Sequence, residues 1–432
     1  MDVSSGSSGP NSREEPVVIT GIGVMLPGAS NVNEFWQDVR AGNSRLGFLT
    51  RCDPGRIPVS VAGQLKGFDH QKYLPDLPDA HARRYSRDAL VVMSAIEEAR
   101  RDASLDGSEI DPRRLSLIAS SSRGPLEWVS NALEDPANDS ENFGNSGAML
   151  RGLPGCAATM SAIHSNIQGL VTTLSSACVG GQHAIGFATE LLRSGAADAV
   201  VVAGYEFPLL SVIYKSFASM GKGVLSSESE DPANAVRPYT RDREGFVFGE
   251  GAVALCLERE SFARDRGAAG YARVLSHRAL NEAGHPFGMD MTGSVTAGVV
   301  VDALAAAGRG PQDVDYYMGH GTGTPKNDVA ESRMLGVLYE GRPRSGWPPL
   351  SSVKPVYGHL LGAAGLVNTA ATALSLHHQC LCATANYAGA APDPECDHDH
   401  VGEGARPAEL DLAVSLSFAI GSQTSALVLG SA

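Results

Sequence analysis

The sequence is short of basic residues, which limits the partners that it can have. It contains 34 Lys and Arg against 48 Asp and Glu, and its formal net charge at pH 7 is −14. General binding to nucleic acid or to anionic membranes needs a basic surface, so we expect neither partner. No apolar run is long enough to span a bilayer, and no secretory signal opens the chain. We therefore expect a cytoplasmic protein.

Cysteines are also few for the length of the chain. There are seven among 432 residues, and an odd number in a long chain argues against a disulfide scaffold. Cys380-Leu381-Cys382 lacks the spacing of a zinc site and has no second cysteine pair. The alternation in Asp397-His398-Asp399-His400 suits a loop or an edge strand. The sequence thus predicts reduced thiols and no metal site.

Alternating strands and helices make up most of the chain. Residues 1–15 are rich in Ser, Gly and charge and are predicted to form a disordered tail. Buried strands and amphipathic helices then alternate, with strands expected at 16–21, 115–120, 170–176 and 199–203 and helices at 33–41, 87–103 and 178–193. A second series follows, with strands at 314–318, 350–353, 412–417 and 424–429 and helices at 328–338 and 361–377. This repetition predicts an α/β protein with duplicated halves, 16–265 and 266–432.

Three residues that can carry chemistry lie at ends of these strands. Cys178 stands among small residues before an expected helix, whose dipole should lower the pKa of the thiol. His320 and His359 each lie in a glycine-flanked loop after a strand. Ligands of α/β proteins gather beyond the carboxyl ends of strands. A buried structural cysteine is the alternative, but the three together favour acyl transfer through a nucleophilic thiol.

A series of motifs in order along the chain then makes a family resemblance specific. The sequence resembles the β-ketoacyl-acyl-carrier-protein synthases of the elongating Cys-His-His class, in the thiolase superfamily. The matching segments are 17–23 (VVITGIG), 35–36 (FW), 175–178 (SSAC), 237–239 (RPY), 243–251 (REGFVFGEG), 320–328 (HGTGTPKND) and 392–397 (PDPECD), with Lys354 five residues before His359. The resemblance implies a thiolase-like duplicated fold with five layers, α-β-α-β-α.

The resemblance also implies roles for individual residues. Cys178 would carry the acyl group, and His320 and His359 would stabilise the enolate that attacks it. Lys354 and Glu331 would form an ion pair that holds the site. Thr322 and Thr324 would contact the pantetheine arm.

The oxyanion hole implied by the resemblance consists of the backbone N–H groups of Cys178 and Ile420, with Phe418 and Ile420 near the substrate. Here the chain departs from the family. Its late loop, 416–422 (LSFAIGS), lacks the usual glycine-rich pattern and second phenylalanine, and 119–123 (ASSSR) replaces another glycine-rich stretch. We therefore expect a substrate range different from that of a housekeeping enzyme.

The leading hypothesis is decarboxylative Claisen condensation of an acyl group on Cys178 with a malonyl-type extender, in type II polyketide or specialised fatty-acid elongation. No cofactor is expected, since phosphopantetheine arrives on an acyl carrier protein supplied in trans. The chain would form a homodimer or pair with a chain-length-factor-like subunit. A housekeeping fatty-acid ketosynthase is the main alternative. A non-catalytic chain-length-factor-like subunit would lack Cys178, a thiolase would need a late cysteine, and an initiating ketosynthase would have asparagine at position 359.

Overall fold

The computed structural model describes residues 15–105, 110–134 and 146–432. Of the tail predicted at 1–15, residues 1–14 lie outside this description, and the Glu15 carboxylate accepts a hydrogen bond from the backbone N–H of Ser261 at 2.9 Å. Within the described residues, no helix combines the length and the apolar composition that crossing a bilayer requires.

Two sets of five strands follow one topology. The first set has the order β1-β7-β6-β4-β5 and consists of β1 (Val17–Met25), β4 (Leu115–Ser120), β5 (Val171–Leu174), β6 (Ala199–Glu206) and β7 (Gly251–Arg259). The second has the order β8-β14-β13-β9-β10 and consists of β8 (Ala272–Asn281), β9 (Tyr316–Met318), β10 (Leu350–Ser351), β13 (Leu412–Ala419) and β14 (Gln423–Ser431).

Strand directions repeat as well as strand order. In both sets the first three strands of the order are antiparallel and the last two pairings are parallel. Antiparallel pairing of β1 with β8 joins the two sets into one ten-stranded sheet. The predicted duplication of the fold is therefore visible as two copies of one mixed five-stranded unit.

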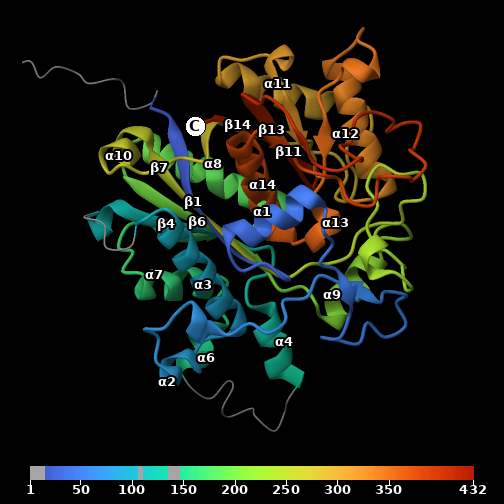
Figure 1. Ribbon diagram of the computed structural model, residues 1–432. Coiled ribbons are helices and arrows are strands. Elements are labelled where there is room, and N and C mark those ends of the chain that lie inside the picture. Colours follow the sequence, from blue (N-terminus) through green and yellow to red (C-terminus); the bar gives the residue numbers. More distant parts are fainter. Residues whose placement is uncertain (1–14, 106–109, 135–145) are drawn as a thin grey trace, which may run out of the picture.

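Helices cover both units and fill the space between them (Figure 1). In the first half, α3 (Arg87–Asp102) and α7 (Cys156–His164) pack on the outer face, and in the second half α11 (Ser294–Ala306) does so, with α12 (Pro325–Leu338) beside it. The middle helices, α8 (Gly180–Arg193) and α14 (Ala364–His378), contact strands of both halves. The layers are thus α-β-α-β-α, as expected from the resemblance.

The part of the chain that the structure describes also contains shorter elements, which connect these layers. The remaining helices are α1 (Val32–Ala41), α2 (Asp79–Ala82), α4 (Leu126–Glu134), α6 (Ser146–Arg151), α9 (Ser211–Ala218), α10 (Glu260–Asp265) and α13 (Lys354–Tyr357). Two small antiparallel sheets pair β2 (Gly47–Phe48) with β3 (Val61–Ala62) and β11 (Cys380–Leu381) with β12 (Arg406–Pro407). The 3₁₀ turns are η1 (His70–Lys72), η2 (Pro112–Arg114), η4 (Ala177–Val179), η5 (Pro232–Asn234), η6 (Pro311–Asp313), η7 (Arg344–Gly346) and η8 (Leu361–Ala363).

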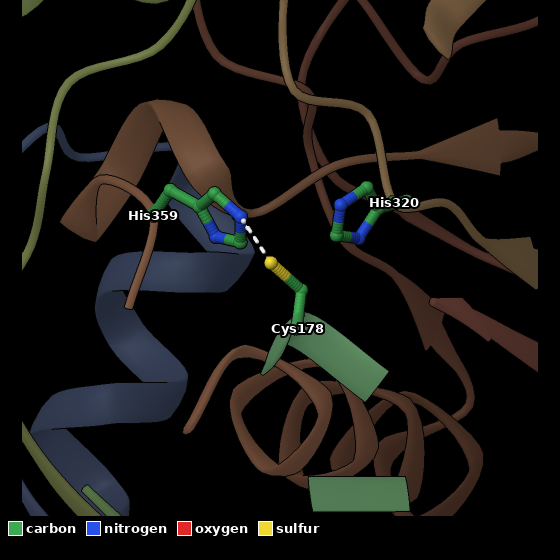
Figure 2. Close-up of side chains that lie close together, drawn as sticks. All are labelled: Cys178, His320 and His359. Atoms are coloured by element: carbon green, nitrogen blue, oxygen red, sulfur yellow. Dashed lines mark hydrogen bonds between the residues drawn. The ribbon is translucent and has the colours of Figure 1, made fainter. Parts of the chain in front are cut away.

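The two middle helices begin side by side because both carry glycine at the crossing. A Cβ atom on Gly365 would lie 2.9 Å from the backbone nitrogen of Gln182, and one on Gly181 would lie 2.9 Å from that of Leu366. Only residues without a side chain allow this approach. As a result Cys178, which precedes α8, and His359, which precedes α14, point toward each other (Figure 2).

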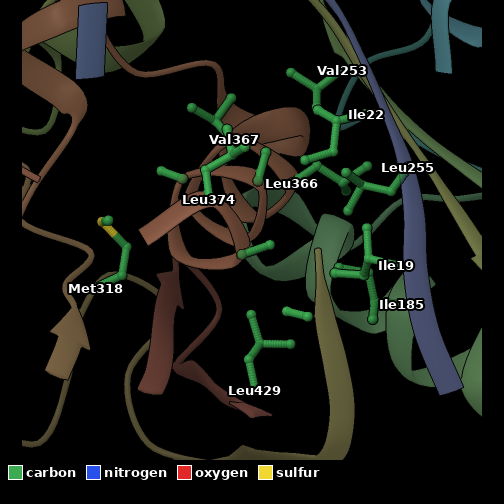
Figure 3. Close-up of a cluster of buried hydrophobic side chains, with 14 of the residues drawn as sticks. Ile19, Ile22, Ile185, Val253, Leu255, Met318, Leu366, Val367, Leu374 and Leu429 are labelled. Carbon is green, nitrogen blue, oxygen red and sulfur yellow. The ribbon is translucent and has the colours of Figure 1, made fainter. Parts of the chain in front are cut away.

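The largest apolar cluster surrounds these helices. Ile19, Ile185, Leu255, Leu366 and Leu429 pack together in it, from strands of both halves and from the two middle helices (Figure 3). Residues 364–376 of α14 are buried on every face of the helix, as expected for a helix that is enclosed on all sides. The site at the start of α8 and α14 therefore rests on the largest close-packed apolar cluster of the described residues.

Candidate active site

A strained turn begins each middle helix. Ala177 has φ +47° and starts η4, and Leu361 has φ +42° and starts η8. Residues with a Cβ rarely adopt this left-handed conformation, which costs of order 1–3 kcal/mol. This strained conformation occurs twice, at corresponding places of the two halves. One turn holds Cys178, and the other follows directly after the loop of His359.

The helix predicted at 178–193 is confirmed, with Cys178 in the 3₁₀ turn η4 that leads directly into α8 at Gly180. The expected lowering of the thiol pKa is wrong. Cys178 is only 9% exposed, and burial raises the pKa of its thiol to about 12, although the charge of Lys354 acts in the opposite direction. At neutral pH the thiol keeps its proton, and its activation requires a base.

His359 is the side chain whose ring nitrogen lies within hydrogen-bonding distance of this thiol. Its Nε2 atom lies 3.2 Å from the Cys178 Sγ atom (Figure 2). The ring of His320 stands at 84° to that of His359, with centroids 5.3 Å apart. Burial lowers the pKa of both imidazoles well below the ordinary value, and the charge of Lys354 lowers both further. Both rings are therefore neutral at physiological pH.

The structure thus brings together the three residues that the sequence singled out. The Sγ atom of Cys178 and a ring nitrogen of each histidine all lie within 4.8 Å of one another. Among the described His, Cys, Asp and Glu residues this is the one group with metal-ligand spacing, and the segment 397–400 forms none.

Lys354 determines which nitrogen of His320 carries the proton. Its Nζ atom lies 3.4 Å from Nδ1 of His320 and also donates to the carbonyl oxygen of His320. An ammonium group has only donors, so Nδ1 accepts and the proton resides on Nε2. His320 consequently presents an N–H donor toward Cys178.

Glu331 holds the other side of the His320 segment. Its carboxylate accepts hydrogen bonds from the backbone N–H groups of His320 at 2.5 Å and Gly321 at 2.7 Å, and from Nδ2 of Asn327 at 2.9 Å. The direct ion pair expected between Glu331 and Lys354, both described and buried, is not formed. Burial raises the pKa of Glu331 and lowers that of Lys354, while the charge of Glu331 acts to keep Lys354 protonated.

Sequence reasoning missed Tyr239, the fourth donor to Glu331. Its hydroxyl lies 3.2 Å from Oε2 of Glu331. A Cβ atom on Gly319 would come within 2.4 Å of this hydroxyl, and one on Gly321 within 2.6 Å. The hydroxyl therefore occupies a notch between the two glycines that flank His320. The Gly-His-Gly spacing was the signal in the sequence that an atom approaches this backbone closely.

The residues expected to bind substrate lie around this centre. The hydroxyls of Thr322 and Thr324 are 2.8 Å apart. The ring of Phe418 packs edge-to-face against His320, with centroids 5.8 Å apart. Strand β13, which carries Phe418, contacts the η4 turn of Cys178. Ile420 follows that strand, and its side chain is 39% exposed.

Glu206, at the end of β6, was also missed. It is fully buried and accepts hydrogen bonds from the backbone N–H groups of Ser122 at 2.8 Å and Gly362 at 2.9 Å. It thereby ties the segment after β4 to the η8 turn. A lone glutamate at the end of an apolar strand offers no signal in the sequence for this contact.

Comparison with known proteins agrees with this geometry. The chain matches the family model for the N-terminal domain of beta-ketoacyl synthase over residues 14–263 and that for the C-terminal domain over residues 271–388. It is 32% identical over 435 residues to the tetracenomycin polyketide synthase ketoacyl synthase alpha subunit of Streptomyces glaucescens, covering 96% of this chain and 97% of that one. It is 31% identical over 415 residues to 3-oxoacyl-[acyl-carrier-protein] synthase 2 of Synechocystis sp., with 95% and 97% covered.

Solved structures show the same likeness. The ishigamide ketosynthase/chain length factor is similar with a TM-score of 0.87 and 27% identity, covering 97% of this chain and all of that one. A type II polyketide synthase acyl-carrier protein in complex with its ketosynthase, AntDE:AntF, has a TM-score of 0.85 and 28% identity, with 97% and 100% covered.

Proposed function

The chain belongs to the β-ketoacyl synthase family, and we propose that it condenses an acyl group held on Cys178 with a malonyl-type extender on an acyl carrier protein. The setting is type II polyketide or specialised fatty-acid chain elongation. One observation carries the assignment of residues: a thiol and two neutral imidazoles converge within 4.8 Å in a buried site.

The first step loads the acyl group. Nε2 of His359 takes the thiol proton as the sulfur of Cys178 attacks the thioester carbonyl. The backbone N–H groups of Cys178 and Ile420 are proposed to stabilise the tetrahedral oxyanion. The C–S bond of the donor then breaks, and the pantetheine thiolate leaves with the proton from His359, so the imidazole is neutral again.

The second step forms the new carbon–carbon bond. The malonyl carboxylate leaves as carbon dioxide, and the electron pair of the broken C–C bond forms an enolate. His320 donates Nε2–H to the enolate oxygen, since Lys354 holds that tautomer. The enolate carbon attacks the acyl-cysteine and the C–S bond breaks. The thiolate of Cys178 then takes a proton from solvent through His359, which balances the one proton consumed.

Two partners follow from this chemistry. Both substrates are thioesters, so an acyl carrier protein is proposed as the donor of each, as in the complex of AntF with its ketosynthase. We also propose a second subunit, either another copy or a chain-length-factor-like chain, because a ketosynthase/chain length factor is among the similar structures. A homodimeric fatty-acid enzyme is the alternative, favoured by the 3-oxoacyl-[acyl-carrier-protein] synthase 2 relatives.

Intact-mass analysis after incubation with acyl carrier proteins tests the proposal. We expect a covalent acyl adduct on the wild type, none on Cys178→Ala, and an unchanged adduct on Cys156→Ala, a control that removes a buried thiol from a different cluster. His320→Ala should keep the adduct but form no ketoacyl product from malonyl carrier protein. An adduct that persists in Cys178→Ala, or none with any acyl donor, would contradict the proposal.

A further inference from the structure

Arg123 lies in a segment that is hydrogen-bonded to the residues leading into the η4 turn of Cys178. The segment follows β4, and the carbonyl oxygen of Ser122 accepts a hydrogen bond from the hydroxyl of Ser175 at 3.3 Å. Ser175 is three residues before Cys178 in the chain. The hydroxyl and the backbone N–H of Ser122 both bind Glu206. The backbone of Arg123 is therefore held in place beside the reactive thiol.

The Arg123 side chain extends over the apolar cluster that contains Cys178. Its guanidinium carbon lies 5.5 Å from the ring centroid of Phe217, and Phe217 belongs to the same buried cluster as Cys178. Phe217 packs edge-to-face on Phe246 at 6.0 Å, and Phe246 packs in the same manner on His359 at 5.0 Å. The rings of Phe246 and Phe217 thus connect His359 with the guanidinium of Arg123 through successive contacts.

This charge has no hydrogen-bond acceptor among the residues that the structure describes, although it acts through space on the buried Glu206 carboxylate and opposes the rise that burial causes in the pKa of that group. The Arg123 guanidinium forms no hydrogen bond or ion pair with these residues, and its Nε atom is buried without a partner, while the side chain as a whole is only partly buried. The nearby carboxylate of Glu206 is already bound by Ser122 and Gly362. Arginine keeps its charge in proteins, and leaving the buried Nε–H unpaired is unfavourable. An acceptor supplied by a bound molecule would satisfy this donor.

We propose that Arg123 is a specificity residue that binds an oxygen on the distal part of the acyl group, either a carboxylate or a ketone carbonyl. The inference rests on the proposed function, since it names the class of acyl group that Cys178 receives. The planar fork of the guanidinium suits such oxygens. A saturated chain of equal length would bury the same charge without pairing it, so it should load about 10- to 100-fold more slowly.

The test compares three pantetheine thioesters of matched length: hexanoyl, 5-oxohexanoyl and adipoyl. Rates of adduct formation on Cys178 are measured by intact mass for the wild type, Arg123→Leu and Arg123→Gln. We expect the wild type to load one or both oxygenated donors 10- to 100-fold faster than hexanoyl, and both variants to load all three at similar rates. Faster loading of adipoyl alone identifies a carboxylate ligand, faster loading of 5-oxohexanoyl alone identifies a ketone carbonyl, and faster loading of both shows that Arg123 accepts either oxygen.

Two results would overturn the inference: a wild type that loads hexanoyl at least as fast, or an oxygen preference that survives in the folded variant. Arg123→Gln replaces Arg123→Leu if the apolar variant does not fold. Arg113→Leu, which changes an exposed arginine, is the matched control and should keep the wild-type preference. No loading of any donor by the wild type would instead count against the proposed function, so the two failures are distinguishable.

Discussion

Replacing Tyr239 by phenylalanine removes one oxygen atom from beneath the His320 segment and leaves the ring in place. The lost hydroxyl donates to Glu331 at 3.2 Å and fills the notch between Gly319 and Gly321. Three donors to Glu331 remain, so the loop should keep its course. The substitution therefore tests whether this hydrogen bond maintains the charge of Glu331, rather than whether the fold tolerates a change.

The size of the effect follows from the contact. A hydrogen bond to a charged group contributes about 1.5–3 kcal/mol, and 3.2 Å is long for an O–H donor, so we take about 1.5 kcal/mol. Since about 1.4 kcal/mol corresponds to one pKa unit, the pKa of Glu331 should rise by about one unit. A neutral Glu331 no longer raises the pKa of Lys354, which should fall. The pH range in which both groups are charged becomes narrower from both sides.

The assay separates loading from condensation. For Tyr239→Phe we expect condensation with malonyl carrier protein to fall about tenfold and its pH profile to narrow, while acylation of Cys178 is unchanged. Tyr317→Phe is the matched control, because it removes a buried hydroxyl that contacts Tyr339 at 3.0 Å in the same apolar cluster. An unchanged pH profile in Tyr239→Phe would refute the reasoning, and an equal loss of loading would indicate general damage to the site.

Three further predictions concern the wild-type site and its frame. Burial raises the pKa of Glu331 and lowers that of Lys354. The rate of condensation should therefore decline as pH falls through the raised pKa of Glu331, and also as pH rises through the lowered pKa of Lys354. A flat pH profile would contradict this. Because the Cys178 thiol is protonated at neutral pH, its alkylation by iodoacetamide should accelerate about tenfold per pH unit; a constant rate would indicate a thiolate. Gly365→Ala places a methyl group against the backbone of α8 and should lower the free energy of unfolding, measured by urea titration, by about 1–3 kcal/mol. The control Gly298→Ala, which has open space around it in α11, should raise the free energy of unfolding by about 0.5–1 kcal/mol. Equal shifts in the two variants would argue against close packing where α8 and α14 cross.

The candidate reactive residues could be singled out from the sequence because each follows a strand in a distinctive glycine-flanked segment. Cys178, His320 and His359 meet as expected, since equivalent strand ends of a duplicated α/β fold lie at one edge. The strand over 272–281 was not predicted. Its outward positions carry charged and polar residues, including Arg273 and Arg278, and its pairing with β14 joins segments far apart in the chain.

The contacts of residues that set the charge around the site were harder to predict, because the internal duplication locates only the residues that lie at its repeated turns. The repeat places Cys178 and the His359 loop at corresponding turns, so motif spacing locates them. Lys354 and Glu331 were implied by the family resemblance, but their contacts were not predicted, because His320 lies between them and each binds a different side of its backbone. Arg123 depends on non-repeated packing, in which the loop after β4 meets α9. Motif spacing therefore predicts the chemistry that is common to the family, whereas the electrostatic environment that selects the acyl group becomes visible only when the two halves and their connecting loops are assembled.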